Sequence, residues 1–304
     1  MTVPAIELTH FRYFIALAEE CHFGRAAARL GIAQPPLTRQ IKLLESRLQC
    51  RLFERNSRST RLTVPGEQLL ERARVVVAEA DRAVLAIHRL GMGEEGHITL
   101  ATAPSLMLGP LPHVIRRFRK KYPRVDFRLS EMASSAILQA IQGGVADLGL
   151  IRGLDRYPEI ETHLRWDEAM IAILPRDFPI GAALTVSAVQ LRSEPFVFFP
   201  RHLGPSFYDE VMGHCKQAGF LPTVSQEARQ WSSILSLVSA GMGVSIGPQS
   251  VEALLPRAVK CLPLKGFRTA VRIAGRRGSS NPAVLNFLRI AQQGLMPLRV
   301  SGLP

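Results

Sequence analysis

Residues 26–41 read AAARLGIAQPPLTRQI, and this stretch decides how the amino-terminal part of the chain folds. A helical segment ends at Leu30, and Gly31 then tolerates positive φ, which lets the chain turn sharply. Pro35 and Pro36 follow in a first helical turn, where a missing N–H costs nothing because those donors have no intrahelical acceptor. The stretch therefore predicts a helix, a tight turn and a second helix.

Outward from this turn, residues 8–48 have the apolar spacing of three short helices and no strand-like alternation. Each segment is too short to be stable alone, so the apolar faces must bury one another. The predicted faces are Leu8, Phe11, Ile15 and Ala18; Phe23, Ala26, Ala27 and Leu30; and Leu37, Ile41, Leu44 and Leu48. We expect an all-α domain here.

The third helix begins with side chains that suit the edges of DNA bases. In the major groove, Gln pairs bidentately with adenine and Arg with guanine, while apolar groups contact the thymine methyl. The candidates at the amino end of this helix are Gln34, Pro35, Pro36, Thr38, Arg39 and Lys42. The sequence thus predicts a helix that reads bases in a groove.

The charge of the chain agrees with this prediction. The 304 residues have 38 Lys and Arg against 25 Asp and Glu, a net charge of +13, which favours nucleic acid or a membrane surface as partner. Residues 51–61 predict a hairpin with arginines at its tip, and Arg55 and Arg58 are expected to reach the DNA backbone or minor groove. A second basic cluster at 116–124 is typical of a solvated helix end.

Residues 64–90 predict one long helix after the hairpin. Thr63 is placed to cap it, and Pro65 falls in its first turn. Its apolar residues have the spacing of a coiled-coil seam: Leu70, Ala73, Val77, Ala80, Val84 and Ile87. Two interpretations stay open, a dimerisation helix and a helix packed on its own domain.

Gly91, Gly93 and Gly96 mark a boundary, after which apolar runs alternate with helical patterns. This alternation predicts βαβ units, a parallel sheet covered by helices, and two α/β lobes with a cleft between them. The expected strands are 97–103, 125–131, 146–151, 169–174, 196–200, 224–227, 244–246 and 270–274. The expected helices are 106–118, 134–142, 206–218, 231–240 and 281–293.

The amino-terminal motifs resemble those of LysR-type transcriptional regulators. The similar residues are FRYF at 11–14, AAARLG at 26–31, QPPLTRQI at 34–41, LE at 44–45, LFER at 52–55 and LTVPG at 62–66. A looser likeness continues to the carboxyl end, with LVSAGMGV at 237–244 similar to the family's effector domain. FPR at 199–201 and GPSFYDEV at 204–211 are most similar to the subgroup that controls aromatic and chloroaromatic catabolism.

The resemblance implies three parts: a winged helix-turn-helix at 1–63, a linker helix for dimerisation at 64–92, and a two-lobed effector domain at 93–304, similar to periplasmic binding proteins. Lobe I would comprise 97–168 and 270–304, and lobe II 169–269. The expected protein is a cytoplasmic activator that binds double-stranded DNA as a dimer, usually assembled into a homotetramer, with RNA polymerase as a further partner and no membrane contact.

The resemblance also implies site residues. The family's base-reading positions fall on Gln34, Pro35, Pro36, Thr38 and Arg39, its wing arginines on Arg55 and Arg58, and its effector contacts on Ser105, Ser134, Ser206 and Phe207. We expect no cofactor and no metal, only a small effector such as an aromatic acid or a muconate-like carboxylate. Trp231 stands at a usually smaller position and is expected to reshape the cleft.

The physical interpretation of these effector residues leaves alternatives open. Each serine begins a predicted helix, where free N–H groups attract a carboxylate, but plain N-capping explains the serines equally well. Phe207 suits stacking on a planar ligand or packing in a core. Arg152 and Arg201 are candidates to neutralise an acid, with exposure to solvent as the alternative, and Arg201 is the one included in the predicted site.

Two other classes of protein compete with a regulator. An enzyme would need a catalytic or cofactor-binding motif. Gly241-x-Gly243 is a weak match to a nucleotide-binding motif, because it follows a helix instead of a strand and has no third glycine. His214 beside Cys215 is interpreted as an incidental pair and not as a catalytic one. A transported-solute binding protein explains the cleft but neither the first ninety residues nor the missing signal peptide. No C-x-x-C pair is present, so reduced thiols are expected, and no apolar stretch is long enough for a membrane span.

Overall fold

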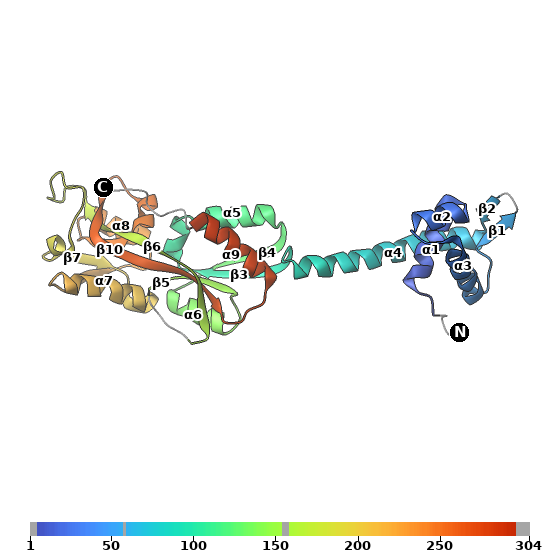
Figure 1. Cartoon of the computed structure of the whole chain (residues 1–304). Coiled ribbons are helices and arrows are strands. Elements are labelled where there is room, and N and C mark those ends of the chain that lie inside the picture. The colour runs from blue at the N-terminus through green and yellow to red at the C-terminus, as the bar shows by residue number, and fades with distance from the viewer. Residues whose placement is uncertain (1–4, 57–58, 154–157, 296–304) are drawn as a thin grey trace. The chain divides into compact units, whose positions relative to one another are not determined.

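The computed structural model describes residues 5–56, 59–153 and 158–295, and Figure 1 shows the elements by label. The chain forms two compact units, residues 1–88 and 89–304. In the described part of the chain, no helix is long and apolar enough to cross a lipid bilayer.

The first unit is built on three helices, as the sequence predicts. They are α1 (Leu8–Glu20), α2 (Phe23–Arg29) and α3 (Gln34–Leu48). The faces predicted for α2 and α3 are confirmed, because Ala26 and Ala27 are buried in one core with Leu37, Ile41 and Leu44.

The face predicted for α1 is displaced. Phe11 and Ile15 are only half-buried, whereas Phe14 and Leu17 are fully buried. The displacement has a tertiary cause, since the Phe14 ring packs on Phe53 from the following hairpin, with 5.4 Å between ring centroids.

The turn between α2 and α3 has the predicted geometry. Gly31 adopts φ +65°, and the N–H of Ile32 donates to the carbonyl of Ala27 at 3.0 Å, which closes the end of α2. Pro35 and Pro36 lie in the first turn of α3. The helix-turn-helix is therefore formed by the residues from which it was predicted.

A two-stranded hairpin follows, and α3 anchors it. The strands are β1 (Phe53–Asn56) and β2 (Ser59–Leu62), which pair antiparallel with Phe53 opposite Leu62. The Glu45 carboxylate of α3 accepts from the backbone N–H of Leu52 at 2.9 Å and of Phe53 at 3.2 Å. Thr63 caps α4 (Val64–Gly91), since its hydroxyl accepts from the N–H of Gly66 at 3.1 Å.

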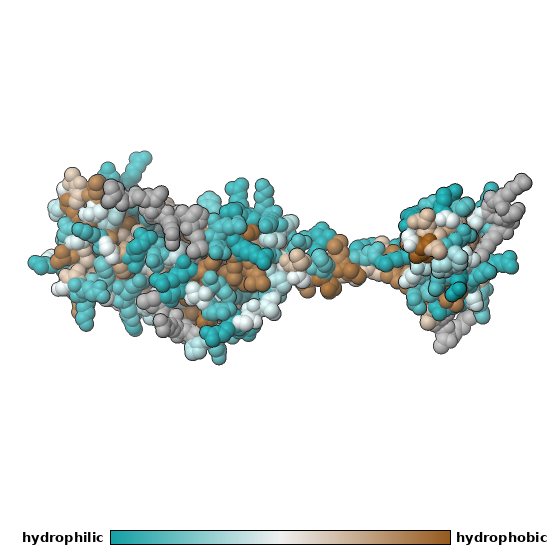
Figure 2. Space-filling view, viewed as in Figure 1, coloured by the Kyte–Doolittle hydropathy of each residue, from teal (hydrophilic) through white to brown (hydrophobic). Residues whose placement is uncertain are grey.

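The seam of α4 has two different environments. Ala73 is buried in the core of the first unit and Leu70 is packed against it, whereas Val84 and Ile87 are each 70% exposed. Figure 2 shows apolar residues at the surface along this helix. Packing on its own domain therefore explains only the beginning of the seam.

The second unit is organised by one six-stranded sheet in the order β4-β3-β5-β10-β6-β9. Its strands are β3 (Glu95–Thr102), β4 (Arg124–Glu131), β5 (Leu148–Arg152), β6 (Ile160–Pro175), β9 (Ser245–Pro248) and β10 (Val259–Arg276). β3, β4 and β5 are parallel as predicted, but β10 is antiparallel to both β5 and β6, so the sheet is mixed. The predicted parallel sheet is thus confirmed for β3, β4 and β5 only. The long strands β6 and β10 and the edge strand β9 add antiparallel pairs, which the predicted segments 169–174, 244–246 and 270–274 did not indicate.

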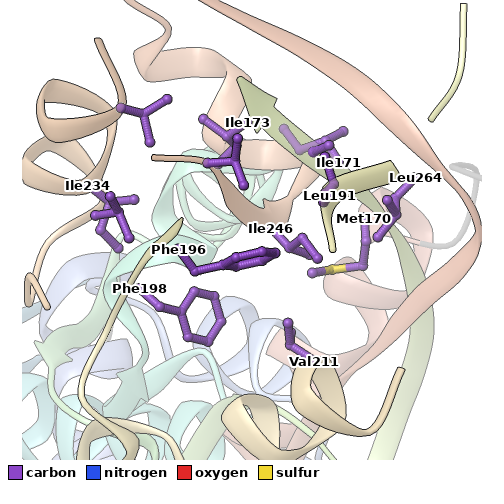
Figure 3. Packing of buried hydrophobic residues seen from close by; sticks show 14 of the residues in the cluster. Met170, Ile171, Ile173, Leu191, Phe196, Phe198, Val211, Ile234, Ile246 and Leu264 are labelled. Atoms are coloured by element: carbon purple, nitrogen blue, oxygen red, sulfur yellow. The ribbon is translucent and has the colours of Figure 1, made fainter. Parts of the chain in front are cut away.

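Separate cores divide this unit into two lobes: lobe I has one core on each face of the sheet, and lobe II has a core of its own. In lobe I, α5 (Leu111–Lys121) and α9 (Pro282–Leu295) cover one face and α6 (Ser134–Gln142) the other (Figure 1). The remaining elements belong to lobe II: η2 (Ala188–Leu191), β7 (Pro195–Phe198), η3 (Arg201–Leu203), α7 (Pro205–Gln217), β8 (Thr223–Glu227), α8 (Trp231–Ser239) and η4 (Gln249–Leu254). Figure 3 shows Phe196 and Phe198 packed among Ile246, Met170 and Val211 in the core of lobe II.

The predicted helix 106–118 is divided in the structure. A 3₁₀-helix η1 (Pro104–Leu108) precedes α5, and Gly109 and Pro110 separate the two. Pro110 has no N–H to continue a helix, so residues 104–108 form a separate 3₁₀-helix before α5.

Candidate functional site

The amino end of α3 presents the predicted base-reading side chains to solvent. Gln34, Pro35, Pro36, Arg39 and Lys42 are exposed, and Thr38 is half-buried, with its hydroxyl donating to the Gln34 carbonyl at 3.1 Å. All of these except Pro36 line one concave surface. Burial of Leu37, Ile41 and Leu44 on the opposite face fixes the orientation of the helix.

Arg39 and Lys42 keep their hydrogen-bonding capacity for a partner. Within the described residues, neither side chain has an ion pair or hydrogen bond, in contrast to Arg29 and Arg74, which both pair with Glu19. An arginine fork and an exposed ammonium on one helix face are the groups that bind guanine edges and phosphates.

The wing is described only in part. The backbone of β1 and β2 forms the expected hairpin. Arg58 lies outside the described residues, and the side chain of Arg55 is outside them as well, so their expected contacts with DNA stay predictions.

A pocket lies between the two lobes of the second unit. Its volume is about 90 Å³, several times the roughly 10–15 Å³ that one water needs. Lobe I contributes Ala103, Pro104, Ser105, Ser134 and Arg152, and lobe II contributes Phe199, Leu203, Gly204, Phe207, Arg229, Gln230 and Trp231. Aromatic rings thus face a small set of polar groups, as is typical of small-molecule sites.

The aromatic wall is well ordered by ring contacts. Phe199 and Phe207 are stacked at 5.7 Å with 1° between their planes, and Trp231 meets Phe199 edge-on at 6.3 Å. The indole of Trp231 has room because Gly247 has no side chain, and a Cβ there would lie 2.7 Å from the ring. Trp231 is therefore part of the pocket wall, and its effect on the cleft relative to the family's smaller residue stays a prediction.

Arg152, at the end of β5, is the buried cation of this pocket. Its side chain is 2% exposed and forms an ion pair with Glu168 of β6 at 2.5 Å. Longer contacts of 3.4 Å run to the hydroxyls of Ser105 and Ser250, and the guanidinium lies 5.8 Å from the centroid of the Phe207 ring. Burial lowers the pKa of Arg152, and the Glu168 carboxylate opposes this shift.

Glu168 and Ser250 tie this cation to both lobes. The second carboxylate oxygen of Glu168 accepts from the backbone N–H of Ser250 at 2.8 Å, and the Ser250 hydroxyl donates to the Ser105 carbonyl at 3.3 Å. One polar network therefore joins η1, β5, β6 and η4 beneath the pocket.

The three predicted serines have different positions. Ser105 and Ser134 line the pocket, whereas Ser206 packs against Gly153, where an added Cβ would lie 2.5 Å from the Ser206 Cβ. None of them is an N-cap, because the cap positions of η1, α6 and α7 are Ala103, Ala133 and Gly204. The N-capping alternative is thus excluded for all three.

Of the two arginine candidates, the predicted one does not reach the pocket. Arg201 is exposed and forms a bidentate pair with Asp209 at 2.7 and 2.5 Å, which lowers the pKa of Asp209. Arg152 lines the pocket instead. An arginine directly after the buried run Leu148–Ile151 was the available signal, since a charge at the end of a buried strand must have a partner.

The residues that an enzyme or a redox sensor would need are unsuited to that chemistry. The His214 ring stacks on Phe267 at 4.0 Å, and burial raises the pKa of the neighbouring Cys215 to about 11. Burial also raises the pKa of Cys261 to about 12. Both thiols therefore stay protonated and poorly reactive. Among the described residues, no cluster of metal-ligating side chains occurs.

Two family profiles match the two units. The profile described as "Bacterial regulatory helix-turn-helix protein, lysR family" matches residues 8–67, and "LysR substrate binding domain" matches residues 91–296. The chain belongs to the LysR family. This LysR-family chain is a DNA-binding transcriptional regulator with an effector-binding domain, and its relatives are regulators, not enzymes.

Individual relatives agree with this assignment over most of the chain. YnfL of Escherichia coli (strain K12), an uncharacterized HTH-type transcriptional regulator, is 36% identical over 85% of this chain and 88% of its own. AlsR of Bacillus subtilis (strain 168) is 31% identical over 94% of this chain and 95% of its own. The crystal structure of CbnR has a TM-score of 0.81 at 28% identity, covering 94% of this chain and 99% of CbnR, and CbnR was also solved with target DNA.

Proposed function

We propose that this LysR-family chain is a transcriptional activator that is switched by a small carboxylated molecule, an aromatic acid or a muconate-like acid, bound in the interlobe pocket. The buried guanidinium of Arg152 beside the aromatic wall is the observation that supports this proposal most. A guanidinium pairs with a carboxylate, and aromatic rings cover a planar apolar body. The pocket has a suitable partner for each half of such a molecule.

The contacts of Arg152 leave capacity for a second anion. Its bond to Glu168 is short, but its contacts with Ser105 and Ser250 are at 3.4 Å, longer than the usual 2.9–3.0 Å. An effector carboxylate would replace these two weak contacts. The hydroxyls of Ser105 and Ser134 would then supply further donors at the pocket wall.

Several relatives support the proposed subgroup and output. The subgroup rests on the likeness to the transcriptional regulators CatR and ClcR of Pseudomonas putida, at 32% and 31% identity, and to CbnR, at 28%. A relative from Acinetobacter lwoffii, 33% identical, is named a probable cat1 operon transcriptional activator. Because AlsR, at 31% identity, is about as similar to this chain as CatR and ClcR, and YnfL, at 36%, is more similar, the chemistry of the pocket has more weight in this proposal than identity does.

The proposed switch acts through self-association. The exposed end of the α4 seam would pair with a second copy, and two such dimers would form a homotetramer with four DNA-reading heads. If the effector binds one arrangement of the two lobes better, a coupling of about 1–3 kcal/mol suffices to change the spacing of the heads. RNA polymerase, the third proposed partner, would respond to the changed promoter geometry.

The effector proposal is tested by thermal unfolding of the full chain with benzoate, cis,cis-muconate and the neutral amide benzamide. We expect the acids alone to stabilise the fold, by RT ln(1 + [L]/Kd). The variant R201Q is the matched control and should respond to the acids as the wild type does, because Arg201 lies outside the pocket. Equal stabilisation by benzamide would contradict the carboxylate proposal.

The switching proposal needs a separate measurement on DNA. Footprinting of the intergenic region beside the gene, with and without the stabilising acid, should show a changed operator footprint or bend. A transcriptional response with an unchanged footprint and unchanged bending would refute the spacing mechanism while leaving the effector proposal intact.

A further inference from the structure

The solvent-facing side of α5 is basic, and no function described above uses it. Leu111, Val114 and Phe118 bury one side of this helix in lobe I. Its five exposed cations, Arg116, Arg117, Arg119, Lys120 and Lys121, are here called the α5 basic face. At roughly 100° per residue, Arg116, Arg119 and Lys120 point away from the buried side, whereas Arg117 and Lys121 lie at its edge.

The α5 basic face has no compensating acids. Across the described residues, none of its five cations forms an ion pair with a carboxylate, while Arg128 nearby pairs with Asp126 at 2.8 Å. Cations separated by three or four residues on one helix repel each other, as Arg116 does with Arg119 and Lys120. The helix dipole favours cations only in the last turn, and Arg116 and Arg117 precede that turn. The helix dipole therefore accounts for Arg119, Lys120 and Lys121, but not for Arg116 and Arg117.

The surroundings of this face distinguish between possible partners. Figure 2 shows hydrophilic side chains over α5, and no large apolar side chain of residues 111–128 is exposed, although Leu129 of β4 and Leu285 of α9 are. A protein partner would bury an apolar core at its interface, which this face does not offer. Duplex DNA needs only positive charge, since it has one phosphate per roughly 1.7 Å of its axis. Three of the five cations are arginines, whose planar forks match phosphate.

We propose that the α5 basic face binds the phosphate backbone of DNA, as a second contact besides the one made by α3. The contact reads no bases, so it adds affinity and salt dependence without changing sequence preference. It requires that the chain binds DNA but not that the effector is a carboxylate. The regulator would thus hold DNA through its effector domain as well as through its helix-turn-helix.

The test compares three full-length variants by titration of the upstream intergenic duplex at several salt concentrations. R116Q/R119Q/K120Q removes three charges from the face, and R192Q/K216Q/R257Q removes three exposed charges from lobe II. R116K/R119K/K120R exchanges the residues and keeps the charge. Thermal unfolding of each variant verifies that it is folded.

We expect only the first variant to bind DNA with a weaker salt dependence than the wild type. Loss of three phosphate contacts makes the negative slope of log K against log salt less steep by roughly 2.7. Between about 50 and 200 mM salt, the wild type should therefore lose about 40-fold more affinity than the variant. The charge-retaining variant should keep the wild-type slope. The lobe II variant should do so as well.

Three results would overturn the proposal. Equal slopes for wild type and the first variant would show that DNA does not touch this face. Equal reductions in the first variant and the lobe II variant would show a long-range effect of net charge. Unchanged DNA binding with reduced activation of purified RNA polymerase would assign the face to a protein. If the wild type bound no DNA at all, the role of α3 in DNA binding would be refuted as well.

Discussion

At the scale of single residues, Arg39 is the clearest test of base reading. Its guanidinium is exposed on α3 and has no partner among the described residues. We expect Arg39→Ala to cost roughly 1–3 kcal/mol of binding and to relax sequence preference, since a bidentate base contact is lost. Arg58→Ala, in the wing, should instead weaken all sequences alike. Gel-shift titrations with cognate and scrambled duplexes distinguish the two variants.

Arg152 allows stability and effector binding to be measured apart. Arg152→Met leaves the half-buried carboxylate of Glu168 with only its hydrogen bond from the Ser250 N–H, which should cost about 3 kcal/mol of unfolding free energy. The double variant R152M/E168M should recover most of that loss, because neither charge is then unpaired. Both variants should fail to bind the acid in calorimetry. Acid binding by the double variant would remove Arg152 from the site.

Glu210 gives a pH dependence with a defined sign. Burial raises the pKa of Glu210, against the opposing effects of the hydrogen bond from Thr269 at 2.7 Å and of Arg152. A raised pKa means that the folded state holds this proton more tightly, so the contribution of Glu210 to stability falls as pH rises through its ordinary pKa and up to the raised one. Glu210→Gln should therefore be more favourable at pH 7 than at pH 4, relative to wild type. Urea unfolding at both pH values measures this difference.

The exposed side chains of the DNA-binding helix were easier to predict from the sequence than the buried side chains of the effector pocket. The exposed candidates of α3 needed only helical spacing, and the structure presents them together. Arg201 was wrongly grouped with the pocket, because its sequence position did not show that Asp209 would pair with it. Ser206 is not among the lining residues, and its contact with an effector stays a prediction. Glu168 gave no signal, since its role depends on a strand pairing between distant segments.

At the scale of elements, α4 is the helix with an unused apolar surface. Val84→Ser/Ile87→Ser should convert the self-associated protein to smaller species while leaving the unfolding free energy of the monomer nearly unchanged, since both side chains are 70% exposed. Val75→Ser is the matched control, because Val75 is 65% exposed but lies outside the seam. Sedimentation velocity would show whether only the seam variant dissociates.

The elements that could be predicted are those with one uniform environment. α6 has the predicted bounds, and β3, β4 and β5 pair as expected, since each lies in a single lobe. The first half of β6 was missed because it has no regular alternation: Thr162, Arg165 and Asp167 are exposed at uneven spacing, and the residues between them are half-buried. Pro110 was visible in the sequence as well, but the prediction of one helix over 106–118 took no account of it, and the structure breaks the helix there.

At the scale of the whole molecule, two compact units imply two unfolding transitions. A ligand stabilises only the unit that it binds, by about 2.7 kcal/mol at a concentration of 100 Kd. We expect the acid to raise the transition of residues 89–304 and a short operator duplex to raise that of residues 1–88. Differential scanning calorimetry records both. A single transition that moves with either ligand would contradict independent unfolding of the units.

β6 and β10 each run through both lobes, because the two strands contribute residues to the core of lobe I and to the core of lobe II. Recombination therefore cannot exchange one lobe without cutting both strands in the middle of their pairing. New effector preferences in such proteins must therefore arise by substitution of wall residues such as Trp231, or by replacement of the complete unit from residue 89 onward. Chimeras of two relatives joined within these strands should be recovered as insoluble protein.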